Sequence, residues 1–215
     1  MLLIALGWVC RAADNPSLPE AERTAKERPL PGEFVPSDLE TKRGTPQAVL
    51  SLIEKASQLS KMRLGYKYGS ADPAVGAMDC SGAIFRLLKD AGFKDVPRQS
   101  DEIYKWVWRG SRVYPVVGRS KKSFEMEKLR PGDLLFWTGT YSVDREVPIS
   151  HVMIYVGNRK SDGGRLMFGA SDGRTYQGVS SFGVGVFDFL EPKASSGTAR
   201  FVGYGPIPGI DTPAP

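Results

Sequence analysis

The stretch MDCSGAIFRLLKDAG, residues 78–92, decides how the rest of the chain is interpreted. Its apolar side chains recur at the spacing of one helix face: Ile84, Leu87, Leu88 and Ala91. This pattern predicts a helix that Gly92 ends. Asp79 stands where an N-cap belongs, so Cys80 is predicted to lie in the first helical turn.

A thiol in the first turn of a helix is close to the positive end of the helix dipole and to unpaired backbone N–H groups. Both favour the thiolate, and the N–H groups can also stabilise an oxyanion. Alternatively, Cys80 is a small buried residue that packs the helix. Its place off the apolar stripe, between polar Asp79 and Ser81, favours a chemical role.

Outward from this helix, the pattern changes from helical to alternating. Upstream, apolar residues from Val49 to Leu59 recur at helical spacing and predict a helix that begins near Pro46 and ends before Gly65. Downstream, five short runs rich in β-formers are separated by Gly, Asp, Asn and Pro: 133–137, 151–156, 165–171, 183–189 and 199–204. Helices first and strands later predict an α+β fold, with N-terminal helices packed on a small antiparallel β-sheet.

The chain of 215 residues is predicted to form one domain, over residues 44–207. Residues 1–13 contain an apolar run followed by small residues and are interpreted as a signal peptide. Residues 14–43, rich in Pro, Glu, Lys and Arg, are predicted to be a flexible leader, and residues 208–215 a loose tail. A lipoprotein anchor at Cys10 is the lesser alternative, because Val9 is bulky for such a cleavage site.

Export would leave Cys80 as the one cysteine of the mature chain, without a disulfide framework. The net charge of +5 suits an anionic polymer such as a cell envelope. The basic residues are scattered, with no aromatic interleaving, which argues against nucleic acid as a partner. We therefore expect a secreted or periplasmic protein of the cell envelope, with no stable membrane insertion after signal removal.

A thiolate nucleophile needs a base, and His151 is the only histidine of the chain. It is predicted to share a strand face with Met153 and Tyr155. A lone histidine at a strand end is ordinarily structural. Its pairing with a single mature cysteine at a helix N-terminus favours a Cys–His couple. One histidine and one mature cysteine do not suffice for a zinc site, and no phosphate-binding loop is present, so we expect no metal and no cofactor.

Five segments occur together in an order and spacing that is specific. They are LGYKYG (64–69), MDCSGAIFRLLKDAG (78–92), VPRQSDEIY (96–104), LRPGDLLFW (129–137) and ISHVMIYVG (149–157). Together they resemble the NlpC family of papain-like cell-wall cysteine peptidases, over roughly residues 44–172. The resemblance implies an enzyme with Cys80 as nucleophile and His151 as base, which cuts peptidoglycan stem peptides.

The same resemblance implies the substrate-binding residues. Tyr66 matches the tyrosine near the nucleophile, and Asp79 and Ser81 match positions that recognise the free amine of a stem peptide and the D-glutamate carboxylate. Arg98 and Ser100 match a segment that lines the same groove. The alternatives without a role in binding are that Asp79 only caps the helix and that Arg98 is a charged surface residue. Residues 131–133 are interpreted as architectural, a turn that leads into a strand.

The sequence departs from this family at Gly169, where a histidine commonly orients the base. Ser171 shares the strand face of Gly169 and could take its place. Asp172, a main-chain carbonyl or a water are the other candidates.

Three functions remain open at this point. The first is hydrolysis of an amide bond of the stem peptide, between γ-D-glutamate and the diamino acid, by a monomeric enzyme. The second is another amidase or acyl-transfer reaction on the same fold. The third is a catalytically impaired wall-binding module, which the missing histidine makes plausible. The role of residues 106–128, an insertion, is not predicted.

Overall fold

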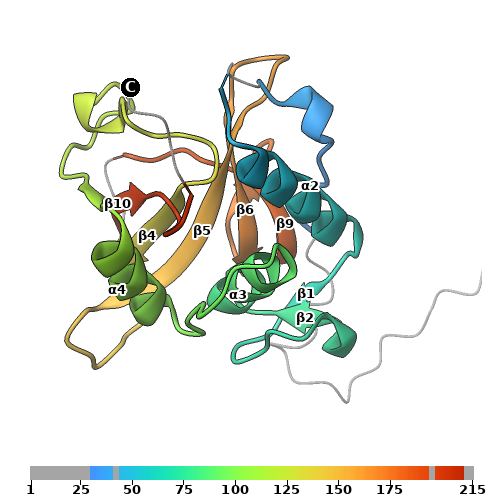
Figure 1. Cartoon of the computed structure of the whole chain (residues 1–215), viewed down its shortest axis with the longest axis horizontal. Helices are drawn as coiled ribbons and strands as arrows, with labels where there is room; N and C mark the ends of the chain where they lie inside the picture. Colours follow the sequence, from blue (N-terminus) through green and yellow to red (C-terminus); the bar gives the residue numbers. More distant parts are fainter. Residues whose placement is uncertain (1–29, 41–43, 194–196, 211–215) are drawn as a thin grey trace, which may run out of the picture.

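The order of helices and strands follows the α+β prediction. The computed structural model describes residues 30–40, 44–193 and 197–210, and the interpreted signal peptide lies outside them. In the described residues, helices α2 (Gln47–Lys61), α3 (Cys80–Asp90) and α4 (Ser100–Gly110) precede most of the strands (Figure 1). The predicted helices at 46–64 and 80–91 correspond to α2 and α3, whereas α4 was not predicted.

The central sheet is antiparallel and has the order β3-β10-β4-β5-β6-β9. Its strands are β3 (Tyr114–Pro115), β4 (Leu134–Thr138), β5 (Ile149–Asn158), β6 (Arg165–Ser171), β9 (Gly183–Asp188) and β10 (Arg200–Gly205). The five predicted strands match β4, β5, β6, β9 and β10 to within two residues at each end. Two short pairs lie outside this sheet: parallel β1 (Gly65–Tyr66) with β2 (Ala77–Met78), and antiparallel β7 (Thr175–Tyr176) with β8 (Val179–Ser180).

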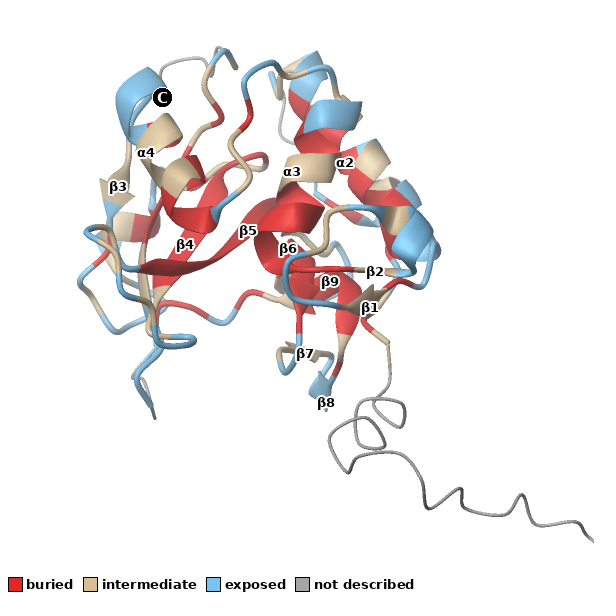
Figure 2. Ribbon diagram, turned by 90° about the horizontal axis from the view of Figure 1, so that it is seen from below, coloured by how far each residue is buried: buried red, intermediate tan, exposed pale blue. Residues whose placement is uncertain are grey.

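One face of the sheet carries the helices. α3 packs on β5 and β6, α2 on β9, and α4 on β5 (Figure 1). The α3 stripe of Ile84, Leu87 and Leu88 is fully buried against the sheet residues Val152, Ile154 and Phe168. Burial of each large apolar side chain contributes roughly 1.5–3 kcal/mol. This interface is the buried centre of the molecule in Figure 2, and it fixes α3 relative to β5.

The opposite face of the sheet carries a second, largely aromatic cluster. Met153 and Tyr155 of β5 point into it, as the strand alternation predicted, together with Trp137. Met126 and Leu129 cover this face from the segment before β4. β3 pairs with β10, and the Tyr204 hydroxyl donates to the carbonyl of Glu125 at 2.7 Å. Residues 111–128, the part of the insertion that follows α4, therefore close this face of the sheet.

The segment 30–40 packs on the domain, although the sequence placed it in a flexible leader. Phe34 and Leu39 are buried, and Gly32 and Leu39 form bridges to Val186 and Arg159. The Ser57 hydroxyl of α2 donates to the carbonyl of Phe34 at 2.7 Å. Two apolar side chains in a polar segment are a weak sequence signal. In the structure these side chains, the two bridges and the bond to Ser57 hold segment 30–40 against the domain. The order of the chain therefore begins before residue 45.

Among the helices of residues 30–40, 44–193 and 197–210, none is both long enough and apolar enough to cross a membrane.

Candidate active site

Cys80 is the first residue of α3, and Asp79 is the N-cap, as predicted. The Asp79 Oδ1 atom accepts a hydrogen bond from the Gly82 N–H at 2.6 Å. Gly82 lies where the helix touches the loop before it: a Cβ there would stand 2.1 Å from the Ser70 carbonyl oxygen. Only glycine allows this close approach. The first turn of α3 is thus clamped between a cap and a loop, and the position of Cys80 is fixed by both.

The thiol of Cys80 lies against the stretch of β5 that contains His151. Its Sγ is 4.0 Å from the carbonyl oxygen of Ser150, to which it donates a weak hydrogen bond, and it lies close to the Val152 N–H. These two backbone groups flank His151. The thiol therefore lies against the backbone on both sides of His151, the residue that the sequence analysis paired with Cys80. Both are buried, at 4% and 7% exposed.

The two groups are electrically neutral in this environment. Burial raises the pKa of Cys80 to about 11, and the Asp79 carboxylate adds to the rise. The neighbouring N–H groups of Val152 and Ser81 lower it by less. Burial, followed by the positive charge of Arg174, lowers the pKa of His151 well below its usual range. The N–H groups therefore favour the thiolate, as expected of a helix terminus, but desolvation of the charge outweighs them and the net pKa rises.

Arg98 connects the two predicted binding residues at the start of α3. Its Nη2 donates to Asp79 Oδ2 and its Nη1 to Ser81 Oγ, both at 2.9 Å. Asp79 Oδ2 also accepts from the Gly69 N–H at 2.7 Å, and Ser81 Oγ lies 3.3 Å from Asp79 Oδ1. With the Gly82 bond, the acceptor sites of the Asp79 carboxylate are filled. Asp79 thus both caps the helix and anchors a half-buried arginine.

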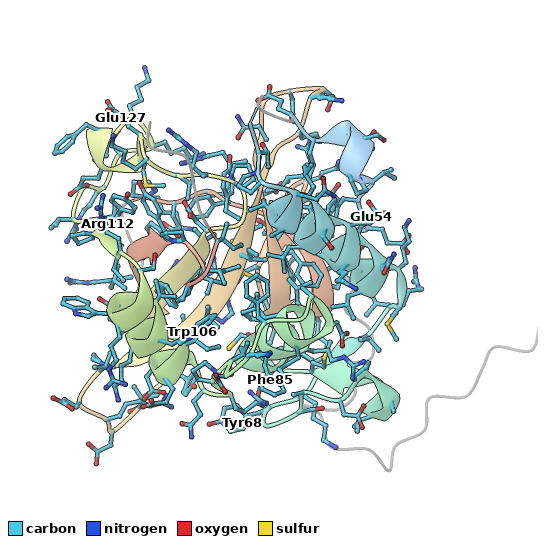
Figure 3. The ribbon with its side chains drawn as sticks, viewed as in Figure 1. Glu54, Tyr68, Phe85, Trp106, Arg112 and Glu127 are labelled. Carbon is cyan, nitrogen blue, oxygen red and sulfur yellow. The ribbon has the colours of Figure 1, made fainter. Side chains whose placement is uncertain are left out.

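A cavity of about 290 Å³ opens beside these residues. Asp79, Cys80, Ser81 and Arg98 line it, together with Tyr68 and Tyr141, whose rings meet edge to face at 5.9 Å. Tyr68 is exposed and lies at the lower edge of the molecule in Figure 3. The cavity therefore combines a carboxylate and a guanidinium at its base with aromatic rings at its rim.

Ser100, the other residue of the PRQS segment, has a structural contact. Its hydroxyl donates to the carbonyl of Ile149 at 2.9 Å and so ties the first turn of α4 to the start of β5.

A second cavity, of about 460 Å³, lies on the histidine side of the site. Tyr66, His151, Asp172 and Arg174 line it. Tyr66 packs edge to face on Phe182 at 6.0 Å, and burial raises the pKa of its hydroxyl, with Cys80 and Asp172 contributing. Tyr66 remains a neutral hydrogen-bonding group beside the thiol. Cys80 thus borders the first cavity and His151 the second.

Arg174 contacts the histidine where the sequence suggested Ser171 or Asp172. Its Nε donates to His151 Nε2 at 3.3 Å. Ser171 instead accepts hydrogen bonds at Oγ from the N–H groups of Gly173 and Arg174, at 3.4 and 3.2 Å, so it shapes the turn that carries Arg174. Arg174 was not predicted, because its only signal in the sequence is a basic residue three positions after the end of a strand.

Gly169 has a packing reason in the structure. A Cβ at this position would lie 3.1 Å from the Cγ and Cε atoms of Met153. Met153 therefore fills the space that a larger side chain at residue 169 would need. A histidine at this position would have to displace the methionine.

An α+β protein with a cysteine at the N-terminus of a helix, packed against a histidine-bearing strand, has the arrangement of a papain-like cysteine hydrolase. A model of the NlpC/P60 family matches residues 63–179. The chain belongs to the NlpC/P60 family, whose members generally act on peptidoglycan as cysteine peptidases or amidases.

One solved structure with a similar fold is described as similar to a lipoprotein of the NLP/P60 family, from Staphylococcus aureus. It is 21% identical, with a TM-score of 0.49, over 82% of this chain and 43% of that chain. This chain thus spans less than half the length of that relative. No curated protein matches.

The neutral thiol gives a testable pH dependence. Because its pKa is about 11, the thiolate fraction of Cys80 grows about tenfold per pH unit below that value. We expect the alkylation rate by iodoacetamide to rise without a plateau from pH 7 to pH 10, measured by mass spectrometry of the peptide that contains Cys80. The Cys80→Ser variant controls for labelling of Cys10. A rate that levels off below pH 7 would show a preformed thiolate and contradict the buried neutral site.

Proposed function

We propose that this protein is a cysteine endopeptidase that hydrolyses an amide bond in peptidoglycan stem peptides, between γ-D-glutamate and the diamino acid. The observation that carries the proposal is the packing of Cys80 against the β5 residues that flank His151. The cavity lined by Asp79, Ser81 and Arg98 supports a substrate with both an amine and a carboxylate on the acyl side. Membership of the family supports peptidoglycan as the polymer.

The reaction follows from these groups. The sulfur of Cys80 attacks the carbonyl carbon of the scissile amide while His151 takes the thiol proton. The N–H groups at the start of α3 lie where they can stabilise the oxyanion. His151 then gives its proton to the leaving amine as the C–N bond breaks. Water hydrolyses the thioester, which releases the acyl product and restores the thiol.

Arg98 and Asp79 suit the two charges of a stem-peptide end. Arg98 can exchange its bonds with Asp79 and Ser81 for a bidentate bond to the D-glutamate carboxylate. This exchange frees acceptor sites on Asp79 for the amine of L-alanine. The ion pair between Arg98 and Asp79 in the free protein would thus be replaced by two contacts with substrate, one from Arg98 to the carboxylate and one from Asp79 to the amine.

Replacement of the nucleophile should abolish the reaction. We expect Cys80→Ala to lower the hydrolysis of purified muropeptides at least about 1000-fold, because no other group in the mechanism can form the thioester. Mass spectrometry of the products measures this and identifies the bond that is cut. Circular dichroism of the variant checks that its fold is retained. Undiminished hydrolysis by Cys80→Ala would exclude this mechanism.

The amine contact predicts a preference for stem peptides that are already detached from the glycan. Acetylation of the L-alanine amine removes its charge and one charge-assisted hydrogen bond, so we expect kcat/KM to fall roughly 10-fold to 100-fold. Asp79→Asn is the matched control, since asparagine keeps the N-cap and loses the charge. This variant should turn over both peptides at similar, low rates. Equal rates on free and acetylated peptides with the unaltered enzyme would assign Asp79 to capping alone.

We further propose that the protein acts outside the cytoplasmic membrane. The apolar start of the chain and its net charge of +5 support this location. N-terminal sequencing of the native protein should find a mature chain that begins near Ala13 or Asp14. A retained Met1 on protein from the cytosolic fraction would contradict export.

A further inference from the structure

The hydrogen bond between Arg174 and His151 has a fixed direction. A guanidinium can only donate, so Nε2 of His151 must accept with its lone pair. A neutral imidazole carries one proton, which must then be on Nδ1. Burial lowers the pKa of Arg174 only to about 10, so the guanidinium keeps its charge at neutral pH.

Several contacts hold the guanidinium in this place. It lies over the Trp137 ring, with Cζ 4.1 Å from the ring centroid, and Trp137 is the cross-strand neighbour of His151. The Ser171 hydroxyl fixes the backbone turn before it. Glu191, buried in the same cavity, attracts its charge. The contact is thus part of the folded site.

The direction of this hydrogen bond determines which nitrogen of His151 can accept the proton of Cys80. Because Arg174 occupies Nε2, only Nδ1 of His151 is left to take that proton. A nitrogen that already carries hydrogen cannot accept another. A fully protonated imidazole is disfavoured as well, because its Nε2–H would face the Arg174 Nε–H with two like charges in contact. In agreement, the thiol donates to the Ser150 carbonyl.

We propose that Arg174 is a positioning residue that holds His151 in the tautomer with its proton on Nδ1, and that the site becomes active only when the guanidinium leaves Nε2. The inference rests on the proposed function, in which His151 is the base. Once Nε2 is free, the ring exchanges protons with water, losing one at Nδ1 and gaining one at Nε2. Nδ1 then takes the proton of Cys80 as the sulfur bonds to the carbonyl carbon.

A carboxylate is the group best suited to draw Arg174 away. A guanidinium binds a carboxylate more strongly than it binds a neutral imidazole, because both partners are charged and two hydrogen bonds can form. Glu191 offers such a group inside the cavity. Several charged and titratable groups surround His151 in this region. They are Cys80 of α3, Tyr66 of β1, Tyr141 after β4, Asp172 and Arg174 after β6, and Glu191 with its ion-pair partner Lys193 after β9.

The tautomer can be read directly, because His151 is the only histidine of the chain. In ¹⁵N-labelled protein, long-range ¹H–¹⁵N spectra distinguish a protonated Nδ1 from a protonated Nε2. We expect Nδ1–H in the unaltered protein at neutral pH. In Arg174→Gln, the amide oxygen can accept from Nε2–H, so the proton should move to Nε2. The pKa of His151 should rise, because the nearby positive charge is gone.

Arg86→Gln is the matched control, since it removes the charge of a partly exposed arginine that pairs with Asp90 and has no contact with Arg174, Glu191 or His151 among those described. It should leave the tautomer unchanged. Iodoacetamide labelling of Cys80 at pH 7 should be several-fold faster in Arg174→Gln than in this control. An Nε2–H tautomer in the unaltered protein, or an unchanged tautomer in folded Arg174→Gln, would overturn the inference. Failure to cleave stem peptides would count against the proposed function alone, because the tautomer is measured without substrate.

Discussion

The packing of the first turn of α3 against β5 is the constraint on which the site depends. Asp79 caps this turn, and Gly82 lets it approach the Ser70 carbonyl. The apolar stripe of α3 then anchors the helix on β5 and β6. A thiol in the first turn has little freedom: it must lie beside the Ser150 carbonyl and the Val152 N–H. The position of Cys80 relative to the β5 residues that flank His151 is therefore a consequence of core packing.

The same packing sets the electrostatics of the site. Close packing excludes water from Cys80 and His151, and the loss of solvation disfavours both the thiolate and the imidazolium. The resting site is neutral, and the charge needed for attack must form when substrate is present. Substrate binding would cover the cavity and bring its own charges. A neutral buried thiol is poorly reactive towards small electrophiles.

Much of the fold could be predicted from the sequence. In α2, α3 and the five longer strands the apolar residues recur at a clear helical or strand spacing, and Gly, Asp, Asn or Pro residues mark where these elements end. The N-cap role of Asp79 was also predictable, as a local property of the chain. The helix α4 was missed, since its apolar positions Ile103 and Val107 are embedded among aromatic and charged residues. The packing of segment 30–40 was not predicted. Its two buried residues, Phe34 and Leu39, form no periodic pattern in the sequence, and their burial depends on the surface of the domain that they cover.

The contact of Arg174 with His151 was not predictable for a different reason. The sequence favoured a partner for His151 on the strand face of Gly169, but Met153 fills that space. The partner comes from the turn after β6, over the face of Trp137. Turn geometry brings Arg174 back towards the strand, and period-2 alternation does not extend into a turn. The direction of the hydrogen bond was also not predicted, because each of the candidates can accept from the imidazole N–H, whereas Arg174 can only donate.

Covalent trapping of the acyl position tests the central claim most directly. An L-alanyl-γ-D-glutamate dipeptide whose γ-carbonyl carries an acyloxymethyl ketone places an electrophile where the scissile carbonyl would lie. Peptide mapping by mass spectrometry should find the label on Cys80, and an excess of free stem peptide should prevent it. No labelling of Cys80 would contradict its role as the nucleophile. Labelling at the same rate by a matched ketone without the dipeptide would contradict recognition of the end of a stem peptide.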